Sequence, residues 1–85
     1  MHGELFPKEV TSNVPRITLT GHEQLHIEQH RGLIDYSQES IVFRSSCGMI
    51  RIAGARMGFA LYTSGEARIT GQIDSVCFEH REGGS

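Results

Sequence analysis

The segment His26–His30 holds the residues best suited to chemistry, because two imidazoles and a carboxylate lie close together in it. On an extended strand His26, Glu28 and His30 project to the same face, and their donor atoms are ligands that zinc or iron accepts. Residues four apart on a strand are separated by ~13 Å, so the two histidines cannot share an ion without a bend. We therefore expect a solvated polar face and no metal site, with these three residues as the only metal candidates.

Nucleophilic side chains occur without the partners that catalysis needs. The run Ser45–Cys47 has no G-x-S-x-G elbow and no positioned acid, so turn chemistry explains it better. Cys47 and Cys77 form no C-x-x-C pattern, and we expect reduced thiols rather than a disulfide. The glycines separate strands and precede no helix, which does not suit phosphate binding. The sequence predicts no catalytic residue, no cofactor and no enzyme.

Charge and hydropathy exclude two classes of partner. The net charge is −2, and acidic and basic residues are interspersed along the chain, which disfavours a nucleic-acid surface. No apolar run approaches the ~20 residues that span a bilayer, so no direct membrane insertion is expected. The segment Met1–Glu4 lacks a basic start and an apolar core, so we expect a cytoplasmic protein without a signal peptide.

Short runs of alternating apolar and polar residues, broken by glycine, predict an all-β protein with an antiparallel sheet. We expect an N-terminal arm over residues 1–14, irregular or with a short helical turn. A β-meander domain of about seven strands should follow over residues 15–79, and then a flexible C-terminal tail over 80–85. A flat meander leaves one apolar face bare, so the sheet must curl into a roll, small barrel or sandwich, or be covered by another chain.

The predicted hairpins keep their apolar residues on one face, and a slip of one residue would destroy this agreement. A change of parity also predicts a bulge or bend near Gly71–Ser75 within the last strand. The predicted cross-strand pairs are Ile17 with Ile27, Leu19 with Leu25, Ile27 with Ile34, Leu25 with Tyr36, Ile34 with Phe43, Tyr36 with Ile41, Phe43 with Ile52, Ser45 with Ile50, and Leu61 with Ile69.

The second face of the predicted sheet carries an apolar stripe where water is expected. An exposed stripe would be a protein-binding surface, whereas a closed barrel or sandwich would bury it, and the sequence leaves both open. Tyr62 and Leu33 are the candidate anchors, and Arg44 and Arg51 are rim charges that fall opposite each other in the predicted register. The candidate interface residues are Leu33, Val42, Met49, Ala60, Tyr62, Arg44 and Arg51.

A family resemblance is carried by residues 15–21, 25–32, 36–37, 48–54 and 69–76. Through these segments the chain resembles the YabP/YqfC sporulation protein family over roughly residues 5–79, with no large gap. The resemblance implies an endospore-forming bacterium, expression in the mother cell and a role without enzymatic activity. It also implies a YqfD-type membrane protein as a partner, which would place the chain at the forespore membrane.

Two functions remain in competition at this stage. In the first, the domain is a structural component that forms a homo-oligomer or docks on a membrane-protein partner, through its sheet edges and the apolar stripe. In the second, the sheet closes into a small β-barrel that binds a small ligand or metal near His26 and His30. The second requires an enclosed polar-lined pocket, whereas the first requires a filled core and exposed apolar surface.

Overall fold

A computed structural model describes residues 14–79, and all of their regular structure is strand. The strands form one antiparallel sheet with the order β1-β2-β6-β5-β4-β3, so the predicted all-β antiparallel class is confirmed. Residues 1–13 of the predicted arm and the predicted tail 80–85 lie outside the described residues. The strands are β1 (Arg16–Thr20), β2 (Gln24–Glu28), β3 (Leu33–Tyr36), β4 (Ser40–Ser45), β5 (Gly48–Tyr62) and β6 (Glu66–Glu79).

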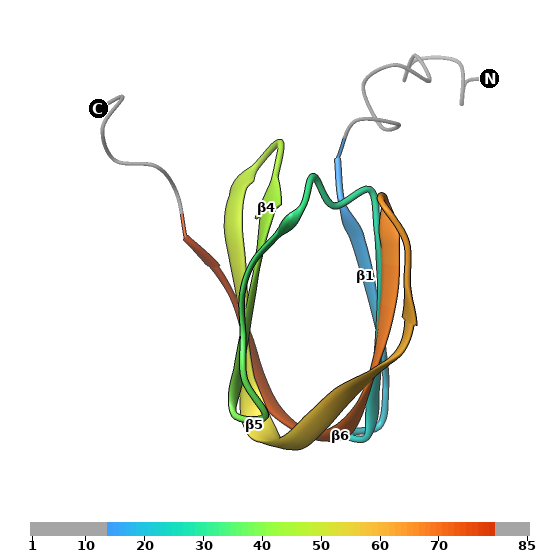
Figure 1. The fold of residues 1–85 in the computed structure, drawn as a ribbon. Helices are drawn as coiled ribbons and strands as arrows, with labels where there is room; N and C mark the ends of the chain where they lie inside the picture. Colours follow the sequence, from blue (N-terminus) through green and yellow to red (C-terminus); the bar gives the residue numbers. More distant parts are fainter. Residues whose placement is uncertain (1–13, 80–85) are drawn as a thin grey trace, which may run out of the picture.

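The sheet folds over on itself because the two long strands, β5 and β6, bend near their middles (Figure 1). One layer contains β1, β2, the first part of β6 and the last part of β5; the other contains β3, β4 and the remaining halves of β5 and β6. Two turns are tied to the bends by backbone hydrogen bonds: Ile73 N–H donates to the His22 carbonyl (2.7 Å), and Gly54 N–H donates to the Glu39 carbonyl (3.0 Å).

Glycine is required where the bent strands cross. A Cβ atom at Gly54 would lie 1.9 Å from the carbonyl oxygen of Gln72. Gly71 has a φ of +132°, and a Cβ atom there would lie 2.5 Å from the carbonyl oxygen of Arg56. Only glycine combines that φ with so close an approach of another backbone, so these two residues permit the sheet to fold over.

The apolar core lies between the two layers and comes from the alternation of the strands. Inward-facing residues of β2, β4 and the first half of β5 are fully buried, and residues of β6 complete the cluster. Burial of this kind is the main force that holds two layers of sheet together. The core residues are Leu25, Ile27, Ile41, Phe43, Ile50, Ile52, Met57, Ala67, Ile69 and Ile73.

The predicted simple meander is wrong at one connection. We expected a tight turn at His30 and Arg31 to pair β2 with β3, but β2 pairs with β1 and β6, and β3 lies at the far edge. Gln29 adopts a φ of 70°, and the chain then crosses from one layer to the other. Apolar residues that face each other across a core show the same alternation as residues paired side by side, so parity alone could not distinguish the two arrangements.

The remaining registers are partly as predicted. The pairs of β1 with β2 are confirmed, as is Tyr36 with Ile41. Phe43 instead pairs with Leu33 and with Ile50, because a bulge interrupts β3 and the β4–β5 turn comes earlier than expected. These shifts also overturn the expected pairs of Ile34 with Phe43, Phe43 with Ile52, and Ser45 with Ile50.

In the long strands β5 and β6, one prediction is confirmed and others are wrong. The bulge expected near Gly71–Ser75 is present, because Asp74 has no residue opposite it. The segment expected to join two strands is part of β5, so the sheet has one strand fewer than predicted. Ile69 pairs with Phe59 rather than Leu61, because β5 carries an extra residue at Ala60.

Candidate interaction surface

One lateral side of the folded sheet is open. Folding preserves the lateral strand order, so β1, the edge of one layer, and residues 73–79 of β6, the edge of the other, lie on the same side. Ile17 and Leu19 come from β1, and Val76 and Phe78 from β6. Ile17 and Val76 pack against the core, while Leu19 is 51% exposed and Phe78 is 45% exposed. We call these four residues and their two strand edges the open side.

The opposite lateral side is bridged by aromatic rings, although Tyr36 (45% exposed) and Tyr62 (47% exposed) also reach solvent. Tyr36 of β3 stacks on Phe59 of β5, with ring centroids 5.2 Å apart, and its hydroxyl donates a hydrogen bond to the Met57 carbonyl (3.3 Å). Tyr62 stacks on the imidazole of His30 at 5.4 Å. Offset aromatic contacts of this kind add to the burial of apolar area, so this side joins the layers where the open side does not.

His30 fixes the crossover between the layers. Its side chain is only 3% exposed. Nε2 lies 3.0 Å from the Thr63 carbonyl, and Gly32 N–H donates to Nδ1 at 3.0 Å. A carbonyl can only accept and an amide can only donate, so the ring is the neutral tautomer with its proton on Nε2. The backbone amides of Gln29 and His30 also donate to the Gly65 carbonyl, which ties the crossover to the β5–β6 turn.

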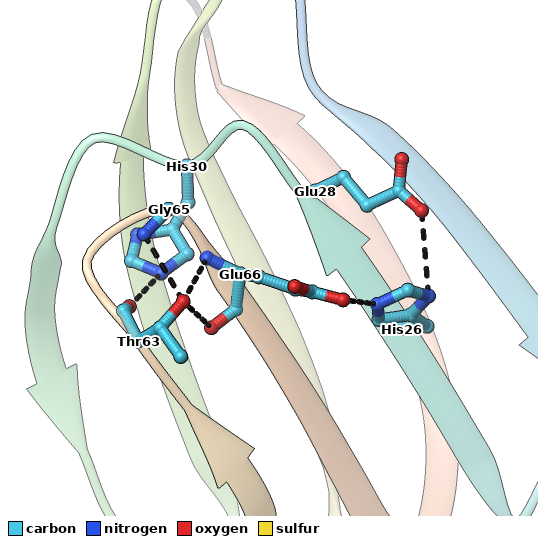
Figure 2. Close-up of polar contacts among 6 residues, drawn as sticks. All are labelled: His26, Glu28, His30, Thr63, Gly65 and Glu66. Carbon is cyan, nitrogen blue, oxygen red and sulfur yellow. Dashed lines mark hydrogen bonds and ion pairs between the residues drawn. The ribbon is translucent and has the colours of Figure 1, made fainter.

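The metal candidates are not brought together (Figure 2). His26 lies on the outer face of β2, with Nε2 2.6 Å from Glu66 Oε2 and Nδ1 3.6 Å from Glu28 Oε2. His30 instead points toward Thr63, away from that pair. Within residues 14–79 no group of three or more histidine, cysteine or acidic side chains is arranged to hold a metal ion. The positive φ at Gln29 separates the two imidazoles, which strand geometry alone had placed on one face.

The predicted apolar stripe is divided between the two faces. Leu33 packs against the core, and Tyr62 pairs with the buried Ala67 and contacts His30. Val42 stays on the outer face of β4 but is only 4% exposed. Met49 lines a surface hollow with Ile34 and Arg44, and Ala60 lies at an exposed bulge of β5. The stripe is therefore no continuous patch.

The two candidate rim arginines do not face each other as expected. Arg44 pairs with Met49 and Arg51 with Val42, again because the β4–β5 turn comes earlier in the chain. Arg51 Nε donates to Glu79 Oε2 at 2.9 Å. The hydrogen bond from Arg51, followed by the attraction of its charge, lowers the pKa of the Glu79 carboxyl, although desolvation opposes this shift. The same bond raises the pKa of Arg51.

Ser45, Cys47 and Cys77 carry nucleophilic side chains. Cys47 and Cys77 are both free thiols. The Ser45 hydroxyl donates to the Gly48 carbonyl at 2.7 Å and accepts from Cys47 N–H at 3.0 Å. Ser45 therefore stabilises the β4–β5 turn, as its sequence context suggested.

A meander already places β1 and the last strand at the edges of the sheet, but the sequence did not show that these two edges lie on the same side of a folded sheet. Leu19 was assigned to the core face, which is correct, but its exposure depends on β1 being an edge strand. Phe78 follows the same pattern on β6. Strand order determines which inward-facing residues reach the edge of a layer, and no local pattern in β1 or β6 reports that order.

The surface hollows among the described residues include three that are shallow rather than enclosed. The first is lined by residues of the β1–β2 turn with Arg56 and Gln72, and the second by Glu28, Thr63 and Glu66. The third is the one at Met49. No bilayer-spanning helix is found among residues 14–79.

Comparison with known proteins gives one family and one curated relative. The model of the YabP family matches residues 11–85. A protein named "Uncharacterized protein YqfC", from Bacillus subtilis (strain 168), is 31% identical over 71 residues, which cover 84% of this chain and 76% of that protein. The sequence had suggested nearness to YqfC, and this match supports it. No solved structure matches the chain.

Proposed function

Because the chain belongs to the YabP family, we propose that it acts in spore formation as a non-enzymatic assembly component in the mother cell. The observation that carries this proposal is the open side, where two strand edges and the exposed side chains of Leu19 and Phe78 occur together. An unpaired edge offers backbone hydrogen bonds to another chain, and exposed apolar groups beside it supply burial. The unpaired edges and the exposed apolar groups together favour association with another chain.

The size of the domain supports a role that depends on partners. A chain of 85 residues buries only ~60–65% of the surface that its unfolded form exposes, so its own core gives limited stability. A partner that binds only the folded form adds to that stability by mass action. Association at the open side would also cover the apolar residues that the domain itself leaves exposed.

Two observations support assembly over the binding of a small ligand or metal. The hollows at the surface are open to solvent, whereas a dedicated small-ligand site buries most of its ligand. The imidazoles of His26 and His30 also have separate partners within the chain.

The family resemblance supports the finer part of the proposal. A YqfD-type membrane protein of the same organism is the proposed docking partner, which would hold the domain at the forespore membrane without inserting it. In this arrangement the open side and the hollow at Ile34, Arg44 and Met49 are the surfaces available for contact.

Deletion of the gene in its own spore-forming host tests the proposal. We expect a loss of heat-resistant spores with unchanged vegetative growth, and a fluorescent fusion that appears in the mother cell. We also expect the purified protein to bind its purified YqfD-type partner in detergent. Normal spore yield from the deletion strain would overturn the sporulation role, and the absence of binding would overturn the choice of partner.

A further inference from the structure

Among the edges of residues 14–79, β1 is regular over its whole length, and its one charge, Arg16, lies at its end. Its register with β2 runs without interruption from Arg16 to Thr20. Edge strands usually avoid association through short length, bulges or charged residues. The other outer edge, β3, is four residues long, is bulged between Leu33 and Asp35, and carries a charge at Asp35. β6 is bulged at Asp74; beyond the bulge its edge is regular over residues 75–79 and ends on Glu79, which is paired with Arg51.

The residues of β1 favour pairing in other ways as well. Ile17, Thr18 and Thr20 are β-branched and have high β-propensity. Leu19 is 51% exposed although it lies on the core side of the strand. Pro15 immediately precedes the strand and has no N–H to donate, so it limits regular pairing to Arg16–Thr20.

We propose that β1 pairs with β1 of a second copy of this chain, antiparallel and centred on Thr18, to join two sheets into one. This inference rests on the proposed function and names the partner and surface for its self-association. With all of β1 used, Thr18 lies opposite Thr18 of the other copy, Ile17 opposite Leu19, and Arg16 opposite Thr20. The parity is preserved, so core-side residues meet core-side residues.

The residue pattern of β1 is self-complementary in this register, which favours a second copy as the occupant. The only charged residue of β1 is Arg16, and the antiparallel pairing places each Arg16 opposite an uncharged Thr20. No like charges therefore face each other directly across the junction. The apolar pair of Ile17 with Leu19 occurs twice by symmetry, which covers both exposed Leu19 side chains. Phe78 lies on the same open side, so the two copies bring their β6 edges toward a common crevice.

Substitutions of opposite charge at Thr20 test the pairing of β1, because they should change the dimer dissociation constant in opposite directions. Thr20→Lys places a cation opposite Arg16 at two symmetric positions, and Thr20→Glu places an anion there. We expect the dimer dissociation constant to rise with lysine and fall with glutamate, each by roughly twofold to thirtyfold at low salt. Sedimentation equilibrium over a range of concentrations measures both. Thr70→Lys and Thr70→Glu are the matched controls, because Thr70 is exposed on the central strand β6, and we expect them to leave the constant unchanged.

Disulfide formation by a cysteine at position 18 tests the register of the proposed β1–β1 pairing. In a background with Cys47→Ser and Cys77→Ser, Thr18→Cys should form an intermolecular disulfide under mild oxidation, because directly opposite residues bring their Cβ atoms within ~5.5 Å. Thr70→Cys should not form one. A wild-type chain that stays monomeric at all concentrations overturns the proposal, as does a dimer that responds equally to Thr20→Lys and Thr20→Glu. In either case the binding of the YqfD-type partner still tests the proposed function separately.

Discussion

The imidazole of His30 fixes the crossover that takes the chain from one layer of the folded sheet to the other. It joins residues from separate elements, with Gly32 N–H on one ring nitrogen and the Thr63 carbonyl on the other. Its ring also stacks on Tyr62 and makes a tilted contact with Phe43. A buried group with both hydrogen bonds satisfied is tolerated, whereas its removal leaves the two backbone partners unpaired.

His30→Ala is therefore expected to lower the free energy of unfolding by about 2–4 kcal/mol, from lost ring packing and two unpaired backbone groups. His26→Ala is the matched control, because His26 is partly exposed and contacts carboxylates on the outer face, where such pairs contribute about 1 kcal/mol or less. Urea unfolding of both variants gives the comparison. Equal losses would contradict the assignment of His30 to the crossover.

The Arg51–Glu79 pair predicts a pH dependence of stability. The pKa of Glu79 is lowered in the folded state, chiefly by its hydrogen bond from Arg51. The contribution is therefore present above the ordinary titration range of a carboxyl, and is lost as the pH falls through the lowered pKa. Glu79→Gln should reduce the urea midpoint slightly at neutral pH and not at all at strongly acidic pH. Glu39→Gln, on an exposed turn, should show no such pattern.

At the scale of the elements, the bends of β5 and β6 decide the fold. Gly54→Ala would place a methyl group 1.9 Å from the Gln72 carbonyl oxygen, and Gly71→Ala would add a side chain at a φ of +132°. Each is expected to destabilise the domain by at least about 2 kcal/mol or to prevent folding.

Gly58→Ala is the control for these bends, because a Cβ atom there meets nothing within 4 Å. Its effect should stay within about 1 kcal/mol. Thermal unfolding followed by circular dichroism ranks the three variants. If Gly58→Ala proved as damaging as the other two, close approach at the bends would not be what requires glycine.

The sequence predicts the local elements well and the long-range order poorly. Alternation and turn residues identify β1 paired with β2, because the loop between them fixes the register. The crossover after β2 depends on a left-handed φ at Gln29, a residue type that gives no strong signal for it. Without that crossover the strand order was wrong, so β3 was not expected at an edge and the two edges of the open side were not expected to lie together.

For the candidate interface residues, it is the bulges, rather than the strand order, that the sequence did not predict. Leu33 and Tyr62 were selected as residues of an outer face, but the bulges in β3 and β5 turn them toward the core or its rim. A bulge reverses the parity of everything beyond it. Bulges in this sheet occur where strands bend or end, and alternation read along one strand does not locate them.

For the whole molecule, we expect spore formation to depend on pairing through β1. In the spore-forming host, the gene is replaced by the Thr20→Lys or the Thr20→Glu allele, and heat-resistant spores are counted. We expect fewer spores with Thr20→Lys and a yield near that of the wild type with Thr20→Glu, at equal protein levels. A wild-type spore yield from the Thr20→Lys strain, when the purified variant is monomeric, would show that assembly through β1 is not needed for spore formation.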